Sequence, residues 1–157
     1  MPLLVRQILL GIGVVLLQFF FFGRLGDLAF GAYPDVVLLF VAAQAIRFGR
    51  LPGAATGFVT GLAMDVLYGT WGAQMFAKTL VGFLVGLFGG RGESTRLRPL
   101  QAFGGALLTA LVHNGILVII MALSTGARTP AMLWGLWLGS ALFTAVVAVL
   151  IAAVRRR

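Results

Sequence analysis

Apolar residues fill most of this chain in long runs, and short polar segments separate the runs. Six runs predict membrane-spanning helices at about residues 3–22, 34–47, 53–69, 74–90, 99–123 and 131–154. A spanning helix needs about 20 apolar residues to cross a hydrocarbon core of about 30 Å. The second run is shorter, so it requires a locally thinned bilayer, a snorkelling Arg47 or burial inside the protein. We expect an all-α polytopic membrane protein in which residues 1–157 form a single integral membrane domain.

Two of the predicted helices carry a small residue at every fourth position. One series consists of Gly53, Gly57 and Gly61 and continues to Asp65, while the other begins at Lys78 and continues through Gly82, Gly86 and Gly90. Residues four apart lie on one face of a helix, and glycines there let another backbone approach closely. The two stripes predict close packing within the protein or, as the alternative, a docking face for a partner's transmembrane helix.

Each glycine stripe also includes one charged residue, Asp65 in the first and Lys78 in the second. A charge inside a membrane helix costs about 2.5–3.5 kcal/mol on insertion scales, so it usually has a partner. Both residues lie near the same short turn of an expected antiparallel pair. We therefore expect Asp65 and Lys78 to pair directly, either as a structural ion pair or as part of a partner-recognition site.

Three further residues are candidates for a binding or structural role. His113 lies in mid-span beside Asn114, which favours an internal hydrogen bond over a proton relay or a ligand contact. Pro34 and Asp35 open the second helix, either as an ordinary helix start or as the lining of an outer groove. The chain has one histidine and no cysteine, which is poor material for a metal site, so no metal and no cofactor are expected.

Composition and charge agree with a membrane protein. Hydrophobic residues make up 61% of the chain and charged residues 10%, against about 25% charged in an average soluble domain. The net charge of +8 reflects membrane topology and not nucleic-acid binding, because nine basic residues fall on one side of the six predicted spans and two on the other. Both termini should therefore be cytoplasmic, and the first apolar run is expected to be a retained span and not a signal peptide.

Aromatic positions give a second indication of the same topology. The two tyrosines and three tryptophans all fall at or near the predicted outer ends of spans, as an aromatic belt requires: Tyr33, Tyr68, Trp71, Trp134 and Trp137. The usual catalytic signatures of zinc proteases, serine hydrolases and nucleotide-binding loops are absent from the sequence. We therefore do not expect an enzyme.

The stretch from Tyr33 to Gly90 resembles the MreD family of bacterial rod-shape-determining membrane proteins. The resemblance lies in Pro34-Asp35 at the start of an apolar helix, in an arginine-containing turn, and in a glycine-rich helix that ends in the segment 61–72. It implies a bacterial inner-membrane scaffold of the elongation (Rod) machinery, or elongasome, which builds peptidoglycan in the cell wall and sets cell shape. The implied partners are an MreC-like single-span protein, the MreB cytoskeleton, a RodA-type synthase complex and membrane lipids.

The same resemblance supplies an alternative function. MreD proteins are similar in fold to the substrate-binding S components of energy-coupling-factor vitamin transporters, so a small-ligand-binding subunit of such a transporter is the competing interpretation. A polar, aromatic-lined outer pocket would be expected in that case. The short predicted outer loops favour the scaffold.

Overall fold

The computed structural model describes residues 2–24, 32–89, 98–125 and 132–154, and within these ranges the chain forms helices and no strands. The all-α prediction is therefore confirmed for the described residues. The elements, in chain order, are α1 (Leu3–Leu17), η1 (Gln18–Phe22), α3 (Val36–Phe48), α4 (Arg50–Tyr68), α5 (Ala73–Gly86), α6 (Pro99–Thr125), η2 (Met132–Gly139) and α7 (Ser140–Val154). η1 and η2 are π-helical turns that continue α1 and precede α7.

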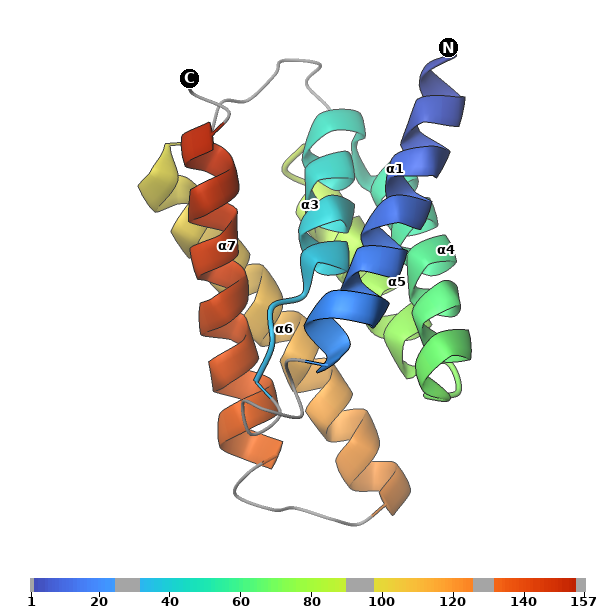
Figure 1. The fold of residues 1–157 in the computed structure, drawn as a ribbon, viewed down its shortest axis with the longest axis vertical. Helices are drawn as coiled ribbons and strands as arrows, with labels where there is room; N and C mark the ends of the chain where they lie inside the picture. Colours follow the sequence, from blue (N-terminus) through green and yellow to red (C-terminus); the bar gives the residue numbers. More distant parts are fainter. Residues whose placement is uncertain (1, 25–31, 90–97, 126–131, 155–157) are drawn as a thin grey trace.

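The helices pack side by side in an up-and-down bundle (Figure 1). The beginning of α1 and the ends of α3 and α7 lie toward one end of the bundle, at the top of the view. Helix α3 is the shortest of the α-helices and begins well inside the bundle, above the lower ends of α6 and α7. The start of α3 is therefore surrounded by other helices.

Among the described residues, three helical stretches are long and apolar enough to cross a membrane, namely Leu3–Phe22, Pro99–Ser124 and Trp134–Val154. Helices α3 and α5 are apolar but contain only 13 and 14 residues, which corresponds to about 20 Å at a rise of 1.5 Å per residue. The structure thus agrees with the prediction that the second apolar run is short. Large apolar side chains cover much of the surface of the bundle, as a membrane protein requires.

The glycine stripes of α4 and α5 face each other. A Cβ atom added to Gly53 would lie 2.6 Å from the carbonyl oxygen of Gly82, and one added to Gly57 would overlap the backbone of Lys78. A Cβ atom added to Gly61 would likewise overlap the backbone of Met75, and one added to Gly86 would overlap that of Arg50. The prediction of close internal packing is therefore confirmed, and these glycine faces are not free to dock a partner.

Several predictions from the sequence lie outside the described residues. They are Gly90 of the second stripe and most of the segments that separate the predicted spans at 23–33, 91–98 and 124–130. Gly23 and Arg24, which were expected in the first loop, are described and extend the first helix beyond η1.

The interlocked glycines predict a position-dependent effect of added methyl groups. Gly57→Ala should lower stability by about 2 kcal/mol, because the new Cβ meets backbone that cannot move away. Gly104→Ala on α6 is the matched control, since a Cβ there meets nothing within 4 Å and alanine favours a helix. Thermal unfolding of both variants in detergent measures the effect. Equal midpoints for the two would contradict this account of the α4–α5 interface.

Candidate functional site

The candidate site is a network of buried polar side chains around the start of α3. The first N–H groups of any helix lack partners within it, and in an apolar bundle each must find one elsewhere. Here the Asp35 carboxylate Oδ1 accepts from the N–H of Leu38 at 2.7 Å. The Asp35 N–H donates to the hydroxyl of Thr144 on α7 at 2.9 Å, and the Val36 N–H donates to the amide oxygen of Gln18 at 2.8 Å. Side chains from η1 and α7 therefore add to the cap that Asp35 gives α3.

Gln18 holds this helix start from two directions. Its Oε1 accepts from Val36, and its Nε2 donates to the carbonyl oxygen of Pro34 at 3.1 Å. The side chain is fully buried and lies at the first residue of the π-helical turn η1. Nearby, the Tyr33 N–H donates to the hydroxyl of Ser140 at the start of α7. The chain before α3 is thus fixed between the first and last helices.

Lys78 on α5 supplies the positive charge at this site. It is fully buried, and its ammonium nitrogen Nζ lies 2.7 Å from Asp35 Oδ2, 2.7 Å from Gln74 Oε1 and 3.1 Å from His113 Nε2. An ammonium group has three N–H donors, so three acceptors from three helices satisfy it. The buried charge is balanced by the Asp35 carboxylate, which is the arrangement that makes a charge tolerable inside a membrane.

The geometry around His113 assigns its tautomer. Nε2 faces the Lys78 ammonium, which can only donate, so Nε2 must be the unprotonated acceptor. The ring proton therefore lies on Nδ1, which donates to Asn114 Oδ1 at 3.0 Å. Asn114 Nδ2 in turn donates to the carbonyl oxygen of Trp137 in η2 at 3.3 Å. A neutral His113 thus connects Lys78 on α5, through Asn114, to the π-helical turn before α7.

The prediction that Asp65 and Lys78 pair directly is wrong. The Asp65 carboxylate instead accepts from the backbone N–H groups of Gln74 at 3.0 Å and Met75 at 2.8 Å, and from the hydroxyl of Thr70. Gly72 is the N-cap residue of α5 and has no side chain that could accept a hydrogen bond. Asp65, near the end of α4, lies against the first turn of α5 and caps that helix instead. Lys78 is one turn further along α5, and its side chain reaches α3 and α6.

The structure brings together some of the candidate residues and separates the rest. Pro34, Asp35, Lys78 and His113 meet in the network, whereas the stripe glycines form the α4–α5 interface and Asp65 caps α5. The sequence reasoning gave no role to Gln18, Gln74 or Thr144. Their only signal was a polar side chain inside an apolar run, and the sequence did not indicate which distant backbone group each one bonds.

The network is internally complete. Among the described residues, only the hydroxyl of Tyr68 is a buried side-chain donor or acceptor with no hydrogen-bond partner. The described part of the chain also has no group of three His, Cys, Asp or Glu side chains that could hold a metal ion. The polar groups of the network therefore bond one another and stabilise the contacts between α3, α5, α6 and α7.

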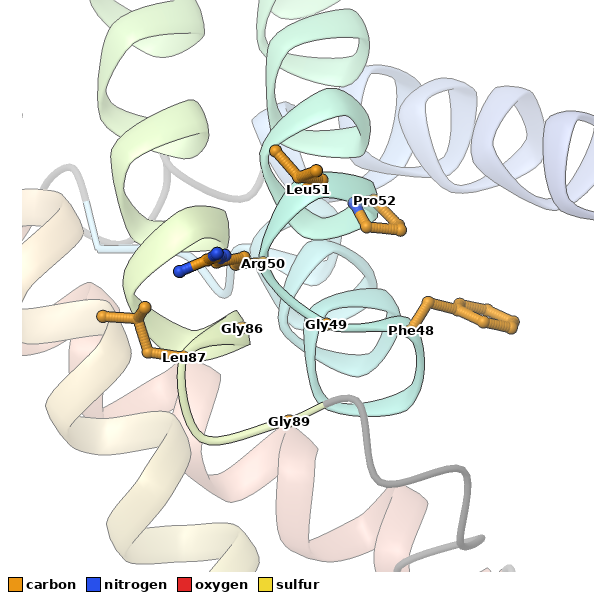
Figure 2. A pocket seen from close by; sticks show the side chains of 8 residues that line it. All are labelled: Phe48, Gly49, Arg50, Leu51, Pro52, Gly86, Leu87 and Gly89. Carbon is orange, nitrogen blue, oxygen red and sulfur yellow. The ribbon is translucent and has the colours of Figure 1, made fainter.

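A separate hollow of about 410 Å³ lies between the α3–α4 turn and the end of α5. Figure 2 shows Arg50 and Leu87 on one side of it and Phe48 pointing to the opposite side, with Gly49, Gly86 and Gly89 between them. Gly86 is eight residues beyond Lys78, a rise of about 12 Å along a helix. The hollow is therefore distinct from the buried network.

Comparisons with known proteins identify no relative: no protein-family model, no curated protein and no solved structure matches this chain.

The ion pair predicts strong coupling between Asp35 and Lys78. Asp35→Asn leaves the ammonium without its counter-charge and Lys78→Met leaves the carboxylate without one, so each change should cost about 3–5 kcal/mol of stability. The double variant removes both charges and should cost clearly less than the sum. Denaturant unfolding in detergent measures all three.

The control for this cycle pairs Lys78→Met with Asp65→Asn. Asp65 bonds backbone groups and not the ammonium, so these two changes should be close to additive. Additivity for Asp35 with Lys78, together with coupling for Asp65 with Lys78, would contradict the observed pairing.

Proposed function

We propose that this chain is a non-enzymatic membrane scaffold of the MreD type that acts in bacterial cell elongation. In this proposal the chain crosses the cytoplasmic membrane six times, with both termini in the cytoplasm. Three helices with the length and apolarity of membrane spans support a membrane location. The common end at which α1 begins and α7 ends supports an even number of crossings.

The observation that carries the proposal is the completeness of the buried network. Lys78 uses all three of its donors on Asp35, Gln74 and His113, and all of these partners are side chains of the bundle itself. A catalytic or ligand-binding site would present polar groups to a substrate, often with some left unpaired until it binds. A closed network instead rigidifies the helices. This favours a function that rests on a fixed shape and on contacts made with the outer surface.

The outer surface of the bundle is suited to contacts within the membrane. Large apolar side chains project from α1, α4, α6 and α7, and a bilayer or a transmembrane helix of a partner can cover them. The resemblance of Tyr33–Gly90 to MreD points to an MreC-like single-span protein as that partner. MreB and the RodA-type synthase then belong to the same assembly, in which the scaffold supports peptidoglycan synthesis and rod shape.

The competing proposal, an S component of an energy-coupling-factor transporter, needs free polar groups around a ligand on the outer side. Asp35, Lys78 and His113 would be the natural candidates, but their bonds to each other occupy them. The scaffold is therefore the better-supported function. The two proposals also differ in the proteins that should accompany the chain.

Affinity purification separates the two proposals. The tagged chain is extracted from native membranes in a mild detergent, and bound proteins are identified by mass spectrometry. The scaffold predicts a single-span protein with a large domain outside the cytoplasm, enriched at least about tenfold over a tagged, unrelated polytopic control. Recovery of an ATPase pair with its membrane coupling subunit would contradict the scaffold and favour the transporter.

A further inference from the structure

The turn between α4 and α5 carries Trp71, whose exposed position is not required by the packing of the bundle. Trp71 is 97% exposed, although tryptophan is among the most apolar side chains. Its φ is 45°, and among the described residues it is the one non-glycine residue with a positive φ. A side chain with a Cβ costs energy in this conformation, and glycine or asparagine would fit the position better. The indole is therefore open to a contact outside the described part of the chain.

Hydrogen bonds hold the turn on either side of Trp71. Gly69 and Gly72 flank it with φ values of 67° and 92°, and backbone bonds run from Thr70 N–H to Asp65 and from Ala73 N–H to Thr70. The Asp65 carboxylate fixes the same turn by capping α5 and binding the Thr70 hydroxyl. The backbone of the turn is therefore held by hydrogen bonds on both sides of Trp71.

The surroundings of Trp71 are apolar and fit a contact with lipid. Val66 on α4 and Phe76 on α5, close to the turn on either side, are 77% and 56% exposed. In a membrane protein, apolar side chains exposed in this way face hydrocarbon. An indole has an apolar body and one N–H donor, which suits the headgroup region where hydrocarbon meets water.

The two ends of the α4–α5 hairpin differ in their residues as a headgroup boundary at the turn requires. Helix α4 has 19 residues, or about 28 Å, and is less apolar than the three stretches with the composition of spans. At its other end lie exposed Leu51 and Phe88, with the arginine side chains of Arg47 and Arg50. Arginine at one end and tryptophan at the other bracket the lipid-facing surface of the hairpin.

We propose that Trp71 anchors the α4–α5 hairpin in the lipid headgroup region on the side of its turn. The anchor fixes the depth of the hairpin in the bilayer, and with it the depth of Lys78, which follows on α5. The proposal depends on insertion of the α4–α5 hairpin in the bilayer, with its turn at one surface. It holds for either orientation of the chain and does not require the scaffold partner, so failure of the purification experiment would leave it standing.

Tryptophan fluorescence tests the depth directly. The chain has three tryptophans, so a full-length W134F/W137F protein reports Trp71 alone. It is reconstituted in phosphatidylcholine vesicles whose acyl chains carry bromine near the glycerol, midway along the chain or near the chain end. The proposal predicts the strongest quenching by bromine near the glycerol, and quenching by aqueous iodide at least about fivefold weaker than for free tryptophan. Strongest quenching near the chain end would overturn it.

Strong iodide quenching without quenching by brominated lipid would also overturn the proposal, because the indole would then lie in water, where a soluble domain could bind it. If the double variant does not fold, the difference in quenching between the unaltered protein and W71F gives the same information, with Trp134 and Trp137 intact.

Trp71→Asn separates anchoring from packing. Asparagine tolerates the backbone, so the thermal midpoint in detergent should not fall, and a clear fall would show that the indole packs against the protein.

Discussion

The structure depends on one requirement: a helix that begins inside an apolar bundle must find a partner for every polar group at its start. Helix α3 begins at Val36, and its cap is assembled from its own Asp35, from Gln18 in η1 and from Thr144 on α7. The carboxylate that serves as cap is also the counter-charge of Lys78 on α5. One residue therefore serves a helix end with one carboxylate oxygen and a buried ammonium with the other. Loss of Asp35 would leave both without this partner in a medium that cannot solvate them.

The rest of the bundle positions the groups that meet this requirement. The facing glycines bring α5 against α4 at backbone contact, and Asp65 fixes the beginning of α5 by capping it. These contacts set the position and rotation of α5 and so direct Lys78 toward Asp35 and His113. From His113 the network continues through Asn114 to η2, and π-helical turns often mark sites where a helix adjusts to a specific contact. The first and last helices thus share one polar centre with the short central ones.

The sequence was sufficient to predict the helices, the shortness of the second apolar run and the close glycine packing, because these follow from local apolarity and from spacing along one helix. It also identified Asp35, Lys78 and His113 as unusual, because a polar or charged residue in an apolar run requires an explanation. It could not assign the ion pair. Asp65 and Lys78 are neighbours across a turn, whereas Asp35 and Lys78 are 43 residues apart and meet only when α3 packs on α5. Pairing between distant helices depends on rotation about each helix axis, which spacing alone does not fix.

The most direct test of the central claim is a distance measurement at the buried charge. The protein is labelled with nitrogen-15 at the side chain of Lys78, the single lysine of the chain, and with carbon-13 at the aspartate carboxyl groups. Solid-state NMR in bilayers then measures dipolar dephasing between Lys78 Nζ and the carboxyl carbons, with Asp35→Asn and Asp65→Asn assigning the source. The account predicts strong dephasing that persists in Asp65→Asn and disappears in Asp35→Asn. Dephasing that disappears in Asp65→Asn and persists in Asp35→Asn would show that Lys78 pairs across the turn, and would contradict the account.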